Sequence, residues 1–240
     1  MASNARPLIL QSIEFLLGIV FDARRAIYFR DQSLLAVADL HLGYAWTHRA
    51  QGQLLPVAAK DDALGRLGEL IAEYRPRQVV LLGDIVHRAL PVPALLEELR
   101  ALLALADGDL ELILLAGNHD RQLQRLLTQL NAGSILRREF RAGDTLFLHG
   151  DNEPAARAPR CVIGHEHPAV SLGDGVATSR KFPCFLIAED VLTLPSFSNW
   201  SAHTPINAYE FMSPLARAAR FETALAILGQ RLLPVPLLKS

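Results

Sequence analysis

The sequence predicts an α/β fold in which mixed sheets form a β-sandwich flanked by helices. Short apolar runs bounded by turn residues alternate with segments of helical periodicity as far as about Leu130. From Thr145 onward the chain consists mainly of strand-like runs. Alternating strands and helices followed by a series of strands are typical of a layered α/β sandwich with a mixed sheet.

The first part of the chain is expected to form three short strands. They are the apolar runs Gly18 to Phe21, Arg25 to Phe29 and Leu34 to Ala38. The polar segments between them, 22–24 and 30–33, have the composition of turns.

Three helices are expected in the middle of the chain. The first runs from Val57 to Tyr74, where leucine and isoleucine recur at helical spacing, and Pro76 ends it. The second runs from Pro93 to Leu105, because proline is tolerated in the first turn of a helix. The third is expected to run through Leu130, with Asp120 as its N-cap.

The remaining strands are expected at six short apolar runs. These are Gln78 to Leu82, Glu111 to Leu115, Thr145 to Leu148, Cys161 to Ile163, Phe182 to Ala188 and Val191 to Leu194. Ala218 to Leu228 has helical spacing, and Leu232 to Leu238, which contains two prolines, is expected to be an extended tail. We therefore expect a single domain over residues 1–240, with a C-terminal extension from about residue 211.

Composition and charge exclude several classes of protein. Of the 240 residues, 50% are hydrophobic and 20% are charged, as in an ordinary globular domain. The formal net charge of −1 argues against a protein that binds nucleic acid by charge alone. Cys161 and Cys184 have no metal-binding spacing and are expected to be reduced core residues. We found no targeting segment and no apolar stretch of membrane-spanning length, so we expect a cytoplasmic protein with no membrane partner.

Residues of metal-binding type follow five of the expected strands, at the edge where open α/β folds collect their ligands. Asp39 and His41 come directly after the strand that ends at Ala38. Residues two apart on an extended chain point to the same side, so this pair is expected to hold one ion. Asp84 follows Gly83 after the next strand, and its two carboxylate oxygens suit it to bridge two ions.

The other three motifs contribute neutral ligands. Asn118 offers an amide oxygen, and His119 beside it is expected to point into the site. The remaining candidate ligands are the strand-end histidines His149, His165 and His167, the last two again two residues apart.

Each motif is weak by itself, because Gly-Asp is a common turn and an isolated histidine is more often a hydrogen-bonded core residue. Five motifs in one series indicate a multi-residue site instead of a sheet with polar loops. Histidine nitrogens with aspartate and asparagine oxygens, and no thiolate, favour manganese, iron or zinc over calcium or magnesium. Two ions ~3.5–4 Å apart stabilise the attacking and leaving oxygens of an in-line displacement. The sequence therefore predicts a metal-dependent phosphoesterase.

The ordered series D-x-H, G-D, G-N-H-D, H and G-H-x-H resembles the calcineurin-like metallophosphoesterase superfamily, over about the first two-thirds of the chain. The resemblance implies the metallophosphoesterase type of β-sandwich. It assigns Asp39, His41 and His167 to one metal, and Asn118, His149 and His165 to the other, with Asp84 bridging. It makes His119 a catalytic residue that contacts the phosphate and protonates the leaving oxygen.

The run after the bridging aspartate differs between branches of that superfamily. Protein serine/threonine phosphatases usually carry G-D-x-x-D-R-G, whereas this chain has Gly83-Asp-Ile-Val-His87. The histidine form is similar to a nuclease branch. His87 is therefore a second candidate catalytic residue, which pairs with His119 or touches the phosphate. The alternative is a surface histidine in a turn.

A narrower resemblance is to the small phosphoesterases called PdeM, the ligase-associated DNA damage response endonucleases. The matching stretches are Val37 to Gly43, Leu82 to His87, Gly117 to Arg121, Gly164 to Ala169, Phe182 to Phe185 and Leu194 to Phe197. The resemblance implies a manganese-dependent phosphodiesterase acting on DNA, preferably single-stranded. A DNA ligase and a helicase of a repair system are the implied protein partners. The loop after His149 is longer here than the His-Glu-Pro run usual in that group.

Other readings stay open from the sequence. One is a phosphodiesterase or phosphatase that acts on nucleotides or other small molecules. Another is a non-catalytic scaffold of the same fold, which would be expected to lack a ligand or His119. Arg88 and Arg121 beside the motifs are the candidate phosphate-binding arginines. Tyr44 and Trp46 are expected either to stack on a base or to cover the core.

Overall fold

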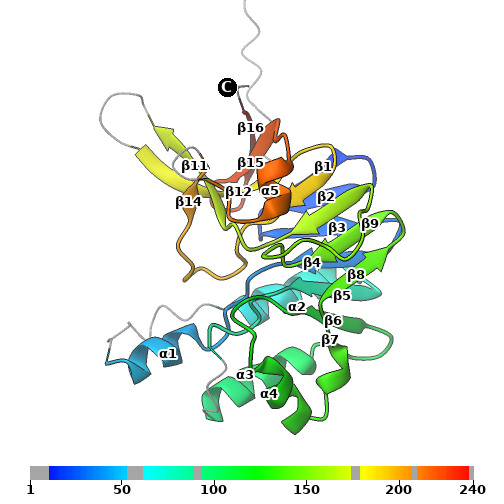
Figure 1. The fold of residues 1–240 in the computed structure, drawn as a ribbon, viewed down its shortest axis with the longest axis vertical. Helices are drawn as coiled ribbons and strands as arrows, with labels where there is room; N and C mark the ends of the chain where they lie inside the picture. Colours follow the sequence, from blue (N-terminus) through cyan, green and yellow to red (C-terminus); the bar gives the residue numbers. More distant parts are fainter. Residues whose placement is uncertain (1–10, 53–61, 89–92, 174–178, 207–209, 238–240) are drawn as a thin grey trace, which may run out of the picture.

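Two sheets packed face to face form the body of the protein in the computed structural model, which describes residues 11–52, 62–88, 93–173, 179–206 and 210–237 (Figure 1). Within these residues the first sheet has seven strands. In spatial order they are β1 (Ser12–Leu16), β2 (Ile19–Asp22), β3 (Ala26–Phe29), β4 (Leu34–Val37), β5 (Gln78–Leu82), β6 (Glu111–Leu115) and β7 (Leu136–Arg137). The first four strands are antiparallel and the last four are parallel, so the sheet is mixed.

The second sheet has nine strands in the described part of the chain. In spatial order seven of them are β14 (Thr204–Pro205), β11 (Pro168–Gly173), β12 (Ser179–Ile187), β13 (Val191–Thr193), β10 (Arg160–Ile163), β9 (Thr145–Leu148) and β8 (Glu139–Ala142). The other two are β15 (Thr223–Ile227), which pairs with β12, and β16 (Leu232–Pro236), which pairs with β15.

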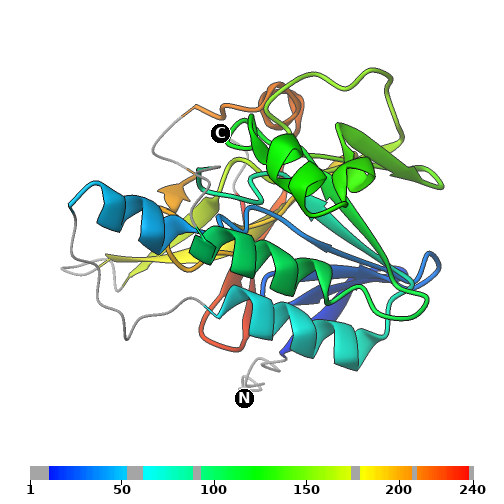
Figure 2. The same cartoon turned by 90° about the horizontal axis from the view of Figure 1, so that it is seen from below.

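Helices cover the outer face of the first sheet. Figures 1 and 2 show α2 (Ala63–Tyr74), α3 (Pro93–Leu103) and α4 (Leu123–Gln129) together on this face. Their buried leucines recur at intervals of three or four residues and pack against β4, β5 and β6, as in the α3 set Leu95, Leu99 and Leu102. The short helix α5 (Pro214–Ala218) packs on the outer face of the second sheet. The predicted α/β fold with mixed sheets and flanking helices is thus confirmed.

Most expected elements lie where the sequence placed them, and the strands β5, β6 and β9 have the expected bounds. The expected start of the first helix, 57–61, lies outside the described residues, and α2 begins at Ala63 behind the N-cap Asp62. The short helix α1 (Tyr44–Ala50) and the 3₁₀ turn η1 (Gly133–Ile135) were not expected.

The expected helix from Ala218 to Leu228 is wrong. Residues 223–227 form β15, which is antiparallel to β12 and buried on both faces. A strand that is apolar on both faces gives a continuous apolar run, and periodicity does not distinguish such a run from a buried helix. The expected extended stretch after Leu232 is β16 as far as Pro236.

Aromatic rings hold the two sheets together. Phe21 of β2 meets Phe185 of β12 edge to face, with ring centroids 5.3 Å apart, and both side chains are fully buried. Phe29 and Phe147 form a second such pair at 5.2 Å. This packing fixes the sheets relative to each other, so that strand ends from both sheets meet at one rim of the sandwich.

At that rim the backbone also links the two sheets directly. Ala38, just after β4, forms a parallel bridge with Ser196, just after β13. The Phe197 amide donates to the Ala38 carbonyl at 2.7 Å, and the Ser198 amide donates to the Asp39 carbonyl at 3.1 Å. The polar residues that follow β4, β5, β6, β9 and β10 are therefore held against a rigid frame. No helix in the described part of the chain is long and apolar enough to cross a membrane.

We expect the Phe185→Ala variant to lose about 3–5 kcal/mol of unfolding free energy, because it removes a buried ring and leaves a cavity between the sheets. Urea unfolding followed by circular dichroism measures this loss. Leu17→Ala is the matched control, since Leu17 is 97% exposed and its truncation should change stability by less than about 0.5 kcal/mol. A loss of less than about 1 kcal/mol in Phe185→Ala would contradict the assigned packing.

Candidate metal centre

Four of the seven candidate ligands form a first group of converging atoms. His41 Nε2 lies 3.5 Å from His167 Nε2, and His167 Nε2 lies 3.6 Å from Asp39 Oδ1. Asp84 Oδ2 lies 3.9 Å from the same His41 nitrogen. The ligand atoms of Asp39, His41 and His167 all lie within 4.8 Å of one another. This group therefore combines side chains that follow β4 and β5 in one sheet and β10 in the other.

The other three candidate ligands form a second group beside the first. His149 Nε2 lies 3.1 Å from Asn118 Oδ1 and 3.1 Å from His165 Nδ1. Asp84 Oδ1 lies 3.5 Å from the same His149 nitrogen. Asp84 thus turns one carboxylate oxygen to each group. Two ligand atoms bound to one ion at ~2.1 Å lie about 3.0–3.4 Å apart. The two 3.1 Å separations of the second group match this spacing, and the separations of 3.5–3.9 Å are wider by a few tenths of an ångström.

The charge at this site also fits a metal. Asp39 and Asp84 are 0% and 3% exposed, and among the described residues neither carboxylate has a lysine or arginine partner. Buried carboxylates without a compensating cation cost several kcal/mol. Histidines surround them instead, and these would be neutral donors once they bind a divalent ion. The residues present therefore fit a site for divalent metal ions.

The pKa values of the site follow from burial and from these mutual charges. Burial lowers the pKa of His41 to about 3, which leaves its ring neutral and able to bind a metal. Burial opposes ionisation of Asp39, but the charge and hydrogen bond of His167, together with the charge of His149, outweigh it and lower the pKa of Asp39 to about 2. Burial, together with the charge of Asp39, raises the pKa of Asp84. The two carboxylates thus repel each other, and a shared cation would relieve that repulsion.

Backbone groups orient these side chains. The Nδ1–H of His149 donates to the Leu82 carbonyl at 3.0 Å, which leaves its Nε2 lone pair facing the second group. The His165 amide donates to Asp39 Oδ2 at 3.1 Å, so the carboxylate of one group anchors the backbone of the other. These contacts fix ring orientation and tautomer independently of any ion.

Five candidate ligands have left-handed backbone conformations: Asp39, His41, Asp84, His165 and His167, with φ between 45° and 66°. Such angles are uncommon for residues other than glycine and cost about 1–3 kcal/mol each. Asp39 and His41 converge, as expected. The extended backbone that the sequence predicted for this pair is wrong. Tight left-handed turns aim these side chains inward, and their strain marks the rim as a functional site.

Two glycines allow the strand ends to approach each other closely. A Cβ on Gly117 would lie 2.3 Å from Asp84 Oδ1 and 2.4 Å from the Asp84 amide. A Cβ on Gly83 would lie 2.3 Å from His149 Nδ1, and Gly83 has a φ of 74°. Any side chain at these two positions would push apart the residues that form the groups.

Asp120 has a different role from the one expected. It does not cap α4, which begins at Leu123 behind Gln122 with no side-chain cap. Its buried carboxylate instead accepts the amides of Ile85, Val86 and Gly117 at 3.2, 3.1 and 2.9 Å. Burial raises the pKa of Asp120 to about 6, although these amides counteract the rise. Asp120 therefore ties the turn after β5 to the turn after β6.

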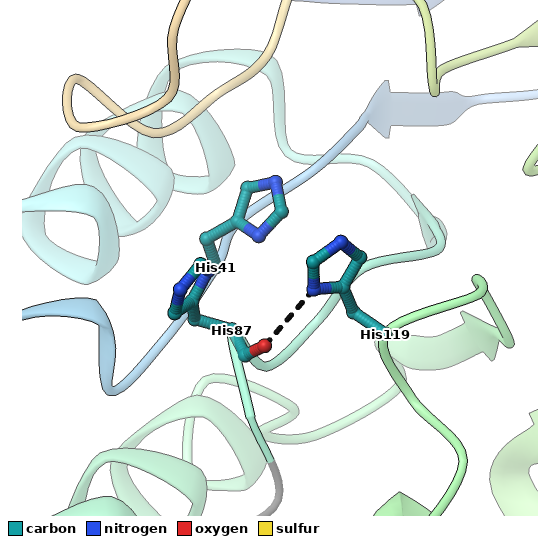
Figure 3. Close-up of side chains that lie close together, drawn as sticks. All are labelled: His41, His87 and His119. Carbon is teal, nitrogen blue, oxygen red and sulfur yellow. Dashed lines mark hydrogen bonds between the residues drawn. The ribbon is translucent and has the colours of Figure 1, made fainter. Parts of the chain in front are cut away.

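The two candidate catalytic histidines lie close to each other and to His41 (Figure 3). His119 donates its Nδ1–H to the main-chain carbonyl of His87 at 3.0 Å, and its Nε2 lies 3.9 Å from Asp84 Oδ2. The expected pairing of His87 with His119 is therefore made by the His87 backbone. The rings are stacked, with centroids 5.6 Å apart.

The His87 ring is not a surface side chain in a turn. It is half-buried between His41, His119 and Tyr44, with centroids 5.6, 5.6 and 4.5 Å away. Burial lowers the pKa of His87 to about 4, and the charges of His119, His48 and Arg88 act in the same direction. His87 therefore presents a neutral ring to the site.

The remaining expected contacts lie around the rim. Arg88 and Arg121 are exposed beside the motifs, as a phosphate-binding role requires. Tyr44 is half-buried, whereas Trp46 is 41% exposed. Trp200, which no sequence motif singles out, stacks on Tyr44 with centroids 5.8 Å apart.

The segment after residue 211 also reaches the metal-ligand motifs. Glu166, between His165 and His167, is 1% exposed and accepts the Ser213 amide at 2.5 Å. Ser213 is the N-cap of α5. The last helix is thus attached to the motif that supplies one ligand to each group.

The chain is similar to known phosphoesterases. A family model described as calcineurin-like phosphoesterase matches residues 33–167, which contain all seven candidate ligands and both candidate catalytic histidines. Among solved structures, the nuclease MPE of Pseudomonas putida is similar with a TM-score of 0.65 and 25% sequence identity, over 94% of this chain and 99% of that chain. No curated protein matches the chain.

We expect Asp120→Asn to lose about 1–3 kcal/mol of stability, because one side-chain oxygen becomes an NH₂ group that faces a backbone amide. The turns after β5 and β6 should then separate, so the variant should also retain less Mn²⁺ after dialysis than the wild type. Asp109→Asn is the control, since Asp109 is exposed in the turn before β6 and should change neither property. Unchanged stability and metal content in Asp120→Asn would show that the carboxylate does not hold these turns.

Proposed function

Because the chain belongs to the calcineurin-like phosphoesterase family and is a metal-dependent phosphoester hydrolase, we propose that it is a dinuclear phosphodiesterase that cleaves DNA, preferably single-stranded. The observation that carries this proposal is the shared position of Asp84. Its two oxygens face two separate groups of ligand atoms, at 3.9 Å from His41 and 3.5 Å from His149.

We assign one ion to each of the two groups of converging ligand atoms. Asp39, His41 and His167 would hold one ion, Asn118, His149 and His165 would hold the other, and Asp84 would contribute an oxygen to each. Nitrogen and oxygen donors without thiolates support manganese as the native metal, with iron or zinc as alternatives. When bound, the ions supply positive charge that stabilises the phosphate and lowers the pKa of water toward neutrality.

His119 provides the proton for the leaving oxygen. Its Nδ1–H is held by the His87 carbonyl, which accepts this hydrogen whether the ring is neutral or charged. The proton that moves is therefore the one on Nε2, on the edge that faces Asp84. The side chain is 38% exposed, so a substrate can reach it without opening the fold.

Two observations support a nuclease over a protein phosphatase. His87 places a neutral ring where those phosphatases carry an aspartate, and this histidine form resembles the nuclease branch of the superfamily. A similar solved structure is that of a nuclease. A role in cytoplasmic DNA repair, with a DNA ligase and a helicase as partners, is part of this proposal and rests on the resemblance of the motifs.

We expect the purified protein to hydrolyse bis(p-nitrophenyl) phosphate when Mn²⁺ is added, and to cleave single-stranded DNA faster than duplex DNA. A substrate panel of both DNA forms, RNA, cyclic nucleotides and phosphoproteins measures the preference. Faster hydrolysis of the cyclic nucleotides than of either DNA would favour a small-molecule phosphodiesterase. No turnover of any phosphodiester with any divalent metal would refute the enzyme.

We expect His119→Ala to keep both ions and lose at least about 100-fold in kcat, since general acid catalysis contributes roughly 10²–10⁴-fold. Asp84→Ala should lose both ions together, because the bridge serves both groups. Metal content by atomic emission, measured alongside kcat, separates the two variants. A fall in metal content in His119→Ala that matches the fall in kcat would make His119 a ligand instead.

A further inference from the structure

A cavity of about 380 Å³ lies directly beside the candidate metal centre, between α1, the start of α2 and α3. Its wall begins at Leu40 and His41 and continues through Trp46, so the segment that supplies one metal ligand also lines the cavity. Trp200 closes another side. The volume falls in the range of sites that hold small organic groups, ~300–1,000 Å³.

The cavity has an aromatic wall that is already in position. Trp46 donates its indole N–H to Glu98 Oε1 at 3.1 Å, and Glu98 Oε2 accepts the Gly43 amide at 2.8 Å. The Arg49 guanidinium lies 5.3 Å from the Trp46 ring centroid. Trp46 is nevertheless 41% exposed, so a large apolar ring is held in place with part of its surface uncovered. Such a ring is preorganised to stack on a planar ligand.

The charges of the lining oppose a phosphate inside the cavity. Its described lining residues include the carboxylates of Asp62, Glu97 and Glu98 against the single guanidinium of Arg49. An anion would be repelled, whereas an uncharged ring with amino groups would find acceptors. The exocyclic amino groups of adenine and cytosine are donors of this kind.

A row of rings connects the cavity to the candidate metal centre. Trp200 stacks on Tyr44 at 5.8 Å with an interplanar angle of 11°, and Tyr44 lies 4.5 Å from His87. His87 in turn stacks on His119 at 5.6 Å. A substrate whose phosphate lies at the ions therefore has an aromatic path for the group attached to that phosphate.

We propose that this cavity is a nucleobase subsite that binds the base next to the scissile phosphate and favours bases with an exocyclic amino group. The proposal rests on the proposed phosphodiesterase function and extends it to substrate recognition. Trp46 is then a specificity-determining residue. Its contribution should appear with nucleotide substrates and vanish with substrates that have no base.

The test compares deoxyadenosine 3′- and 5′-(p-nitrophenyl phosphate) with methyl p-nitrophenyl phosphate, which lacks a base but has the same leaving group. In Trp46→Ala, the ratio of kcat/KM for the better nucleotide ester to that for the methyl ester should fall about 5- to 100-fold, the loss expected for one base–aromatic stack. Trp46→Phe should restore most of the ratio. Leu17→Ala, on the turn between β1 and β2, should leave it unchanged.

The outcomes separate the two proposals. If the wild type hydrolyses all three esters and Trp46→Ala leaves the ratio unchanged, the subsite is wrong and the phosphodiesterase stands. If the wild type hydrolyses none of them with any divalent metal, both proposals fail.

A binding measurement on the wild type covers the case in which Trp46→Ala does not fold. Trp46 and Trp200 are the only tryptophans of the chain, and both line the cavity, so tryptophan fluorescence reports on it directly. A single-stranded deoxyadenylate oligonucleotide in EDTA should quench this fluorescence to saturation, whereas inorganic polyphosphate should not. Equal quenching by the two, or none by the oligonucleotide, would overturn the subsite.

Discussion

Two buried carboxylates determine how this protein is built. Asp39 and Asp84 offer oxygens that lie within 4.8 Å of each other and of His149, in an interior that screens charge poorly. The described fold brings no lysine or arginine to either of them and surrounds them with histidines. Folding therefore brings two like charges together, and divalent ions would neutralise them. Ions that bind only the folded state also stabilise that state.

The rest of the structure is arranged to hold that pair in place. The carboxylates follow β4 and β5, which are adjacent parallel strands; all four residues of β4 and the last four of β5 are buried. Strained left-handed turns are tolerated there because the surrounding contacts fix the backbone: the Asp39 amide donates to the Gly83 carbonyl at 3.2 Å and the His41 amide to the Asp84 carbonyl at 2.8 Å. The aromatic pairs between the sheets then bring the histidines that follow β9 and β10 to the same rim.

The sequence predicted this arrangement to the extent that it depends on strands and residue types. Apolar runs located β5, β6 and β9, and polar residues at strand ends identified all the side chains that converge. Backbone conformation was not predictable, because Asp-Leu-His carries no glycine to signal a left-handed turn. Asp120 was misassigned because an aspartate before a helical run has the same appearance whether it caps the helix or binds distant amides. Trp200 reaches Tyr44 only through tertiary contact, which no local pattern records.

The site has two halves of different character, and this division fits a nucleic acid strand. One half consists of buried carboxylates and ligand histidines, where positive ions and a phosphate would lie. The other half consists of neutral rings, since burial lowers the pKa of His87 to about 4 and Tyr44 and Trp200 stack beyond it. A nucleotide chain likewise carries anionic phosphates and uncharged aromatic bases in alternation. His87 stands at the boundary, where its carbonyl orients the proton donor His119 and its ring faces the aromatic half. Replacing this histidine by aspartate would put an anion at that boundary and remove the neutral ring that continues the aromatic half toward His119.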